Sequence, residues 1–547
     1  MEYPLKTHRV LLIPELLNII FNHLDLPSNA ANARVCRLWS DISLDVLWKE
    51  VTKLKRLLQI LAPLDVDETG ELKFQRLPES ADWRRFEKYA KRVRKLTYHS
   101  SSRRNLSGSA FDVVARTRTR LDILPNMHTL IWSGPPSFSI IFMHSRVKTF
   151  SVALDTNDEF LQPYFHDLVS RMPHLTTLNI QSSIPMREIE PKMVELLLAL
   201  PKLQKVVFPR FYFTTKIVET LSTLEQLGTM EFQYDQEQGV GKPEDVQDFT
   251  PTLVEGAFPA LFDMSTNVRY NDAARFLNLP YAPRNITSLF IDSTDLEHPS
   301  DMYDVLSIIA ENCKSLKLLA LVSLRESFDD DPPDEGMSIT LDTIKPAFKL
   351  QHLTSLDITH QFPLLLDQKD VETIASTWPS MESILLNPDP VHLSEPDLTL
   401  EALLPFAQHC PKLKQLGLYI DATSCSDLAT PTIRFKALSL LAMGVSPITD
   451  DSPVSLYLSQ LLPLGCIVGC GVTWDEADAF RLNLSPRFTL WHTVDDLLPL
   501  LIKLRIEERE RTKHMEHELD DLRMRTKVIS GREQLGAAKD VSTCIVA

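Results

Sequence analysis

Cysteine and histidine are the residue types in this chain that could support metal binding or nucleophilic catalysis. Seven cysteines and 15 histidines are spread over 547 residues. Cys466 and Cys470 are separated by three residues, which does not fit the ligand pairs of zinc sites, and no second pair follows them. The motifs H-E-x-x-H, G-x-S-x-G and G-x-x-x-x-G-K-[ST] are all absent from the sequence. We therefore expect no catalytic residue, no metal ligand and no cofactor.

The last four residues have the pattern of a lipidation signal. Residues 544–547 are Cys-Ile-Val-Ala, which fits C-a-a-X with a last residue of the farnesyl type. The preceding segment has no basic cluster and no second cysteine, and one lipid chain alone anchors a protein only weakly. Cys544 is therefore a candidate lipidation site, and we expect membrane association only if it is prenylated. The alternative is a chance match.

Charge is distributed unevenly along the chain. The formal net charge is −16, yet residues 1–120 carry 22 Lys and Arg against 14 Asp and Glu. The acidic remainder disfavours nucleic acid as a partner. A basic stretch, RRFEKYAKRVRK at 84–95, is expected to be mainly a solvated helix face.

The sequence has no feature of a secreted or membrane-spanning protein. No apolar run approaches the roughly 18 residues that a membrane span needs. The N-terminus lacks the pattern of a secretory signal, and the scattered cysteines fit a reducing compartment. We expect a cytoplasmic or nuclear location.

A short phrase recurs along most of the chain. It consists of an apolar residue, a proline, and then apolar residues that alternate in the way of a short strand. Proline disfavours helix in the residue before it, so each phrase ends a helix and starts a strand. Copies with proline are LPNMHTLIW (124–132), MPHLTTLNI (172–180), LPKLQKVVF (200–208), WPSMESILL (378–386) and CPKLKQLGL (410–418), with FPALFDM (258–264) as a weaker one. Copies without it are VRKLTY (93–98), VKTFSV (147–152), ITSLFI (286–291), LKLLAL (316–321), LTSLDI (353–358) and LSLLAM (438–443).

Helical stretches precede many of these phrases, for example 165–172, 193–200 and 305–313. A unit of helix, tight turn and strand cannot bury its own apolar face, so neighbouring units must stack. The pattern resembles an irregular leucine-rich-repeat solenoid, of class α/β, with parallel strands on one side and helices on the other. The alternative is a non-repetitive α/β domain, including an α/β enzyme.

The N-terminal segment has more apolar residues than one helix face can carry. In residues 11–24, apolar side chains point almost all round the expected helix, whereas a surface helix normally shows one apolar stripe. A second helix is expected after Ser28, which we take as its N-cap, and a third over 43–51. Three short helices rarely supply a sufficient core by themselves, so we expect a second polypeptide to cover part of this segment.

The order of these residues resembles the F-box motif. Ile13-Pro14-Glu15 stands where that family has Leu-Pro-x-Glu or Leu-Pro-Glu, and the apolar residues to Leu24 match its first helix. Residues 35–39 match V-C-[RK]-x-W, and residues 47–49 match L-W-[RK]. Ile13 replaces the usual Leu, a volume-conserving change.

The resemblance implies a partner and a function. F-box proteins bind the adaptor subunit of the Skp–cullin–F-box ubiquitin ligase, and through it a cullin. The first helix would divide its apolar side chains between its own core and the adaptor. The residues implied in adaptor binding are Ile13, Pro14, Glu15, Leu16, Leu17, Ile20, Phe21, Leu24, Val35, Cys36, Trp39, Leu47 and Trp48.

We therefore expect a substrate-recognition subunit of such a ligase, with no catalysis of its own, whose repeats capture an unidentified target protein. The alternative is a repeat scaffold that uses the F-box for another partner. The expected organisation is an F-box at 9–51, linker helices at 52–92, a leucine-rich-repeat-like solenoid at 93–495, a C-terminal helix at 496–529 and a flexible tail at 530–547.

Overall fold

The computed structural model describes residues 9–100, 105–155, 158–234, 238–324, 335–424, 428, 431–474 and 482–540. The contacts between residues divide the chain into two compact units. Unit 1 comprises Met1–Thr294 with Ile308–Leu316, and unit 2 comprises Asp295–Ser307 with Lys317–Ala547.

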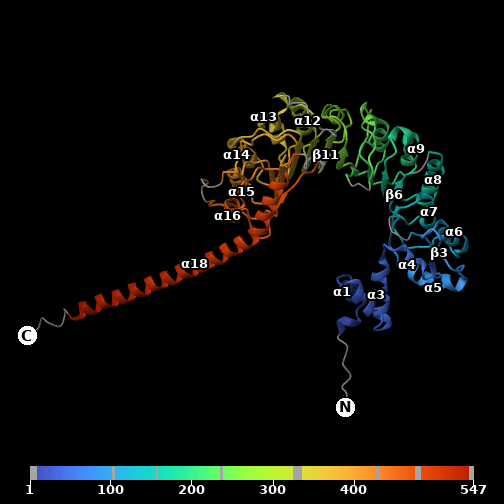
Figure 1. Ribbon diagram of the computed structural model, residues 1–547, viewed down its shortest axis with the longest axis horizontal. Helices are drawn as coiled ribbons and strands as arrows, with labels where there is room; N and C mark the ends of the chain where they lie inside the picture. The colour runs from blue at the N-terminus through green and yellow to red at the C-terminus, as the bar shows by residue number, and fades with distance from the viewer. Residues whose placement is uncertain are drawn as a thin grey trace, which may run out of the picture. The chain divides into compact units, whose positions relative to one another are not determined.

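Unit 1 begins with a helical segment and continues with alternating helices and strands (Figure 1). Its helices are η1 (Arg9–Leu12), α1 (Pro14–Asn22), α2 (Leu26–Asn32), α3 (Arg37–Lys49), α4 (Leu54–Leu58), α5 (Ser80–Ala90), α6 (Gly108–Thr117), α7 (Pro136–Ser139), η2 (Ile140–Phe142), α8 (Asp158–Arg171), α9 (Met186–Leu198), α10 (Thr215–Ser222), η3 (Pro243–Asp245) and α11 (Tyr270–Leu277). Its strands are β1 (Glu50–Val51), β2 (Leu64–Val66), β3 (Leu72–Phe74), β4 (Lys95–His99), β5 (Thr129–Ser133), β6 (Thr149–Leu154), β7 (Thr177–Ser182), β8 (Lys205–Phe208), β9 (Thr229–Phe232), β10 (Asp263–Thr266) and β11 (Ser288–Ser293).

Unit 2 repeats the same alternation and ends in a long helix. α12 (Pro299–Asn312) has residues in both units. The other helices are η4 (Glu335–Met337), α13 (Leu341–Ile344), η5 (Lys345–Lys349), α14 (Gln368–Thr377), η6 (Leu400–Ala402), α15 (Leu403–His409), α16 (Asp451–Leu461) and α18 (Ser485–Asp540). The strands are β12 (Leu318–Ser323), β13 (Ser355–His360), β14 (Ser383–Leu386), β15 (Gln415–Leu418), β16 (Leu440–Gly444) and β17 (Ile467–Cys470).

The strands follow one another in sequence order. In unit 1 the strands of the repeat sheet are ordered β1-β4-β5 and onward to β11, in unit 2 they are ordered β12 to β17, and the pairings within each unit are parallel. The register is regular: Thr129 of β5 pairs with Lys95 on one side and with Thr149 on the other. This is the α/β repeat solenoid expected from the sequence, of the leucine-rich-repeat type.

The recurring phrase forms the repeat as its residue types predict. In MPHLTTLNI, the four side chains of Met172, Leu175, Leu178 and Ile180 are all fully buried. The proline ends α8, the residues after it turn, and β7 follows with alternate residues inward. Helices α7, α8 and α9 lie on one side of the strands around β6 (Figure 1).

Every phrase identified in the sequence ends in a strand of this sheet. The predicted strands are therefore confirmed, and the sequence missed three more. β1 has only two residues, β17 follows a glycine turn, and β9 follows LEQLGTMEF, in which no proline precedes the turn. β9 has no such local signal, and its place in the sheet is determined by its pairing with β8 and β10.

Buried polar side chains close the turns after several strands. The Oδ1 atom of Asn387 accepts the backbone N–H of His360 at 3.1 Å, and its Nδ2 donates to the carbonyl of Phe362 at 2.7 Å. The hydroxyl of Ser446 accepts from the backbone N–H of Ile420 at 3.1 Å. Because buried backbone groups need partners, these side chains satisfy backbone groups of the turns that follow the strands.

The segment between the F-box-like region and the repeats differs from the predicted linker helices. It contains α4 and α5, but β2 and β3 form an antiparallel hairpin between them. The turn DETG at residues 67–70, in which Gly70 has φ +88°, allows this hairpin. β1 also joins the repeat sheet by pairing with β4, so the sheet begins before residue 93.

The C-terminal helix is longer than predicted at both ends. We expected a helix at 496–529 and a flexible tail from 530, whereas α18 begins at Ser485 and continues to Asp540. Trp491, Val494 and Leu498 are buried, so packing on unit 2 determines its first turns. Residues 541–547, including Cys544, lie outside the described residues.

Candidate functional site

The F-box-like segment folds as a small helical unit with its own core. Leu17 and Phe21 of α1 are 0% and 2% exposed and pack with Ile42 of α3. Leu11, Leu38, Trp39 and Val46 border this cluster. All seven side chains belong to residues 9–51, which we call the three-helix unit, so its core is complete without later segments of the chain.

Local signals fix the ends of α1 and α2. Pro14 occupies the first turn of α1, where a missing N–H costs nothing, and Glu15 lies near the positive end of the helix. Asp25, and not Ser28, is the N-cap of α2, because its carboxylate accepts the backbone N–H of Ser28 at 3.0 Å. The hydrogen bond from Ser28 also lowers the pKa of the Asp25 carboxyl.

A buried asparagine joins α2 to the end of α1. Asn29 is 0% exposed, and its Nδ2 donates to the backbone carbonyls of Phe21 at 2.8 Å and Leu24 at 3.2 Å. The Phe21 carbonyl also accepts the backbone N–H of Leu24 at 3.2 Å, so Asn29 adds a second donor at the end of α1. The apolar pattern of the segment did not predict a role for Asn29. The available signal was an asparagine at a position where an apolar residue would be expected.

The second and third helices differ from their predicted bounds. α2 ends at Asn32, and Val35 and Cys36 lie in the turn before α3 instead of on a helix. α3 runs without a break from Arg37 to Lys49, so 43–51 is not a separate helix. Cys36 adopts the extended N-cap position of α3, and this places both residues of the turn at the surface.

The two tryptophans of the motif have structural contacts. The indole N–H of Trp39 donates to the carbonyl of Leu11 at 3.2 Å, and its ring meets Phe21 edge-on at 5.4 Å. Trp48 contacts the ring of Tyr89 on α5 at 5.2 Å. Both tryptophans are half-buried, as is Leu47. Trp39 therefore fixes the geometry of the three-helix unit, and Trp48 attaches it to α5.

Ion pairs attach the same unit to the start of the repeats. The Arg92 guanidinium binds the carboxylate of Asp41 at 2.9 Å and also pairs with Asp45. The backbone N–H of Arg94 donates to the carbonyl of Lys49 at 2.8 Å. All of these contacts involve α3, so α3 carries the attachment and α1 is left uncovered by the linker.

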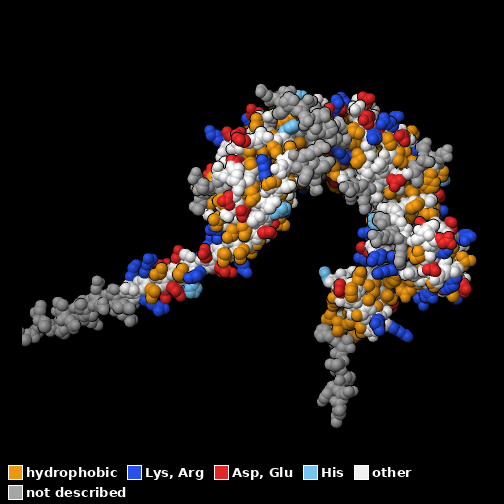
Figure 2. Space-filling model, viewed as in Figure 1, with side chains coloured by type: hydrophobic (Ala, Val, Ile, Leu, Met, Phe, Trp, Pro, Cys, Tyr) orange, Lys and Arg blue, Asp and Glu red, His pale blue; other side chains and the backbone are white. Residues whose placement is uncertain are grey.

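An apolar surface remains exposed on α1 and beside it. Ile19 is 56% exposed and Val35 61% exposed. Figure 2 shows hydrophobic side chains gathered over the region of α1 and α3. The large hydrophobic residues exposed on this surface are Leu12, Ile13, Leu16, Ile19, Ile20, Leu24, Leu26 and Val35. We call them the exposed apolar surface.

The structure divides the predicted adaptor-binding residues into two sets. Leu17 and Phe21 are a correction, because their side chains are inside the three-helix unit and cannot reach a partner. Trp39, Leu47 and Trp48 are only partly accessible. The residues that stay accessible, with binding still a prediction, are Ile13, Pro14, Glu15, Leu16, Ile20, Leu24, Val35 and Cys36.

Within the residues that the structure describes, no group of three or more His, Cys, Asp or Glu side chains is arranged to hold a metal ion. Among these same residues, no helix has the length and hydropathy to span a membrane.

Comparison with known proteins gives no family for the chain. No family model matches it, and no curated protein matches it. Among solved structures, a chain of the "Crystal structure of Rad7 and Elc1 complex in yeast" is similar at 12% identity and a TM-score of 0.22, over 61% of this chain and 58% of that one. A chain of the "Crystal structure of TLR13-ssRNA13 complex" is similar at 13% identity and a TM-score of 0.28, over 66% and 56%. The chain thus spans less than two thirds of the length of either.

Proposed function

We propose that the chain is the substrate-recognition subunit of a Skp–cullin–F-box ubiquitin ligase. In this proposal the exposed apolar surface binds the adaptor, the adaptor binds a cullin, and the repeats bind a target protein. The chain carries out no catalysis itself and works in the cytoplasm or the nucleus.

The observation that carries the proposal is that α1 has both buried and exposed apolar side chains. Its core residues are already buried by the three-helix unit, so the exposed leucines and isoleucines are surplus to folding. Soluble monomers rarely leave a large contiguous apolar patch in water, and such a patch commonly marks a protein-binding site. Burying each of these side chains fully contributes about 1.5–3 kcal/mol.

The attachment through α3 also supports the proposal. A ligase subunit must hold its target at a set distance from the catalytic partner, because misplacement of reacting groups slows a reaction strongly. The contacts of Arg92 and Trp48 tie the three-helix unit to the turn before β4 and to α5.

Co-purification with a Skp-type adaptor and a cullin tests the proposal. Leu16 and Ile20 are exposed and lie on one face of α1, one turn apart. We expect the variant with Leu16→Glu and Ile20→Glu to lose adaptor affinity by more than about tenfold while remaining folded. Leu17→Ala would be unsuitable, because it disturbs the core.

A matched control is available on α18. Leu500 and Leu504 are exposed leucines one turn apart, so Leu500→Glu with Leu504→Glu makes the same chemical change elsewhere. This control variant should bind the adaptor as the wild type does. Failure of the wild-type chain to bind any Skp-type adaptor would refute the proposal, and adaptor binding without a cullin would favour the alternative of a non-ligase scaffold.

The lipidation of Cys544 remains a separate prediction. Mass spectrometry of the C-terminal peptide from the native host would detect a farnesyl group and loss of residues 545–547. An unmodified Cys544 followed by Ile545, Val546 and Ala547 would rule it out.

A further inference from the structure

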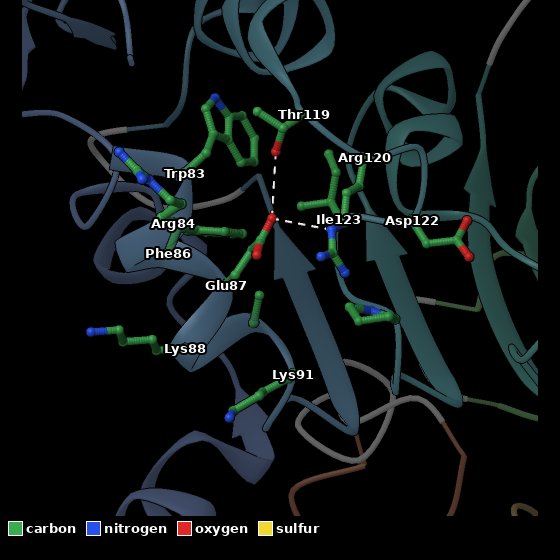
Figure 3. Close-up of a pocket in the computed structure, with 12 residues that line it drawn as sticks. Trp83, Arg84, Phe86, Glu87, Lys88, Lys91, Thr119, Arg120, Asp122 and Ile123 are labelled. Carbon is green, nitrogen blue, oxygen red and sulfur yellow. Dashed lines mark hydrogen bonds and ion pairs between the residues drawn. The ribbon is translucent and has the colours of Figure 1, made fainter. Parts of the chain in front are cut away.

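A cavity of about 320 Å³ lies between α5 and the segment that leads to β5. Its size is within the range of ligand-binding pockets. Figure 3 shows residues of α5 on one side and residues 119–123 on the other. Of the residues that line this cavity, none belongs to residues 9–51 and only Pro125 belongs to a recurring phrase.

The floor and the rim of the cavity differ in chemistry. The floor is formed by the buried side chains of Trp83, Phe86, Ala90 and Ile123. The rim carries the exposed side chains of Arg84, Lys88, Lys91, Thr119, Arg120 and Asp122. An apolar floor with a charged rim suits a ligand that has one apolar group and several charges beside it.

The charge of the rim is positive overall. Glu87 is compensated, because its Oε1 atom lies 3.2 Å from Nε of Arg120 and 3.5 Å from the hydroxyl of Thr119 (Figure 3). Arg84, Lys88 and Lys91 form no ion pair among the residues that the structure describes. By contrast, the neighbouring Arg85 is paired with Asp82. Three cations beside the cavity are thus available to an anionic ligand.

Hydrogen bonds to Asp82 fix the start of α5, the helix on one side of the cavity. The carboxylate of Asp82 receives hydrogen bonds from Arg76 at 2.6 Å, from the backbone of Glu79 at 3.0 Å and from Arg85 at 3.1 Å. The bond from Arg76 is the main reason why the pKa of Asp82 is far below its usual value. Arg84 and Lys88 therefore project from a helix whose start is fixed, and Lys91 follows its last residue.

We propose that this cavity binds an acidic peptide segment, in which an aromatic or aliphatic side chain enters the floor and flanking anionic groups meet Arg84, Lys88 and Lys91. The anionic groups are carboxylates or phosphorylated hydroxyls, which share the chemistry that this rim recognises. The acidic peptide would belong to a target protein, and this last point rests on the proposed function.

Fluorescence polarisation with a defined peptide tests the inference on the full chain. The probe is a fluorescein-labelled peptide with one phenylalanine flanked on each side by glutamates. We expect saturable binding that weakens as salt is raised, since exposed charges are screened. Replacing the glutamates by glutamines, or the phenylalanine by glycine, should weaken binding by about tenfold. A peptide with phosphoserines in place of glutamates distinguishes phosphate from carboxylate as the preferred anion.

Charge reversal on the protein completes the test. Arg84→Glu with Lys88→Glu should weaken binding of the glutamate peptide by about tenfold. The control is Lys53→Glu with Arg56→Glu, an equal charge change at exposed residues outside the cavity, which should leave binding nearly unchanged. Equal weakening by both variants, or equal binding of the glutamine peptide, would overturn the proposal.

The two proposals can fail independently. The Arg84 and Lys88 variant should still bind the adaptor, and the Leu16 and Ile20 variant should still bind the peptide. Peptide binding without adaptor binding would refute the ligase and keep the acidic-peptide site. The reverse result would refute this site and leave the ligase in place.

Discussion

The three-helix unit and the repeats use apolar residues in opposite ways. In the repeats, each phrase buries its apolar side chains between a strand and a helix, and strand after strand shows the same alternation. In the three-helix unit, α1 buries Leu17 and Phe21 and leaves Leu16, Ile19 and Ile20 in water. Residues of one chemical type thus stabilise the fold in one region and remain available to a partner in the other.

The difference follows from stacking. A repeat has a neighbouring repeat on each side, so its apolar face is covered within the chain. The three-helix unit is attached to the rest of unit 1 through α3 and β1, which contact α5, the turn before β4 and β4 itself. Stability should therefore depend on core residues in both regions, whereas adaptor binding should depend on exposed residues in only one.

The largest effect on stability is expected in the repeats. Trp132 is fully buried, its N–H donates to the carbonyl of Pro135 at 3.0 Å, and its ring stacks on Tyr98 at 4.4 Å. Trp132→Ala should destabilise unit 1 by about 3–5 kcal/mol. Hydrogen–deuterium exchange should show the loss of protection first in β4, β5 and β6. Unchanged exchange in these three strands would show that Trp132 does not stabilise them.

A slightly smaller and more local effect is expected in the three-helix unit. Leu17→Ala removes a fully buried side chain and should cost about 2–5 kcal/mol. Because the core of this unit is separate, exchange should rise in α1 to α3 and stay low in β5 to β11. Spread of the loss into those strands would show that the two regions share one core.

The next effect concerns the polar connection between α1 and α2. Asn29→Ala removes both donors to the carbonyls of Phe21 and Leu24 and should cost about 1–3 kcal/mol. Thermal unfolding measures this loss of stability, and hydrogen–deuterium exchange in α2 locates it. A change below about 0.5 kcal/mol would mean that water replaces the amide.

The smallest effect is a pH dependence confined to unit 2. Burial raises the pKa of Asp389 to about 6, and burial together with the Asp389 charge raises the pKa of Asp357 to about 6. Unfolded aspartate has a pKa of about 3.9, so between about pH 4 and pH 6 the folded state binds more protons and stability falls as pH rises. Asp357→Asn should therefore stabilise unit 2 by about 1–2 kcal/mol above pH 6, and this gain should vanish near pH 4.

Thermal unfolding of wild type and variant across pH 4 to 8 measures this difference. The control is Asp397→Asn, which removes a charge from an exposed residue of the same unit. A gain from Asp357→Asn that is the same at every pH would contradict the raised pKa as its cause.

Most of the repeat architecture was predictable because its signal is local. A proline that stops a helix and an alternation of apolar residues act over about nine residues, so all the identified phrases became strands. β9 and β17 were missed because neighbouring strands, and not their own residues, place them in the sheet. The hairpin of β2 and β3 was missed because its two strands are only three residues long.

For the candidate site, residue types alone established that the first fifty residues hold more apolar surface than a single helix face can use. Which side chains face inward depends on how α1 meets α3, and that choice puts Leu17 and Phe21 inside and Leu16 and Ile20 outside. The turn at Val35 and Cys36 and the anchoring of Trp48 by Tyr89 likewise arise from contacts between distant segments. Periodicity is a property of residues that are neighbours in the chain. Burial depends instead on which other segments pack against a residue, and only the folded chain contains those contacts.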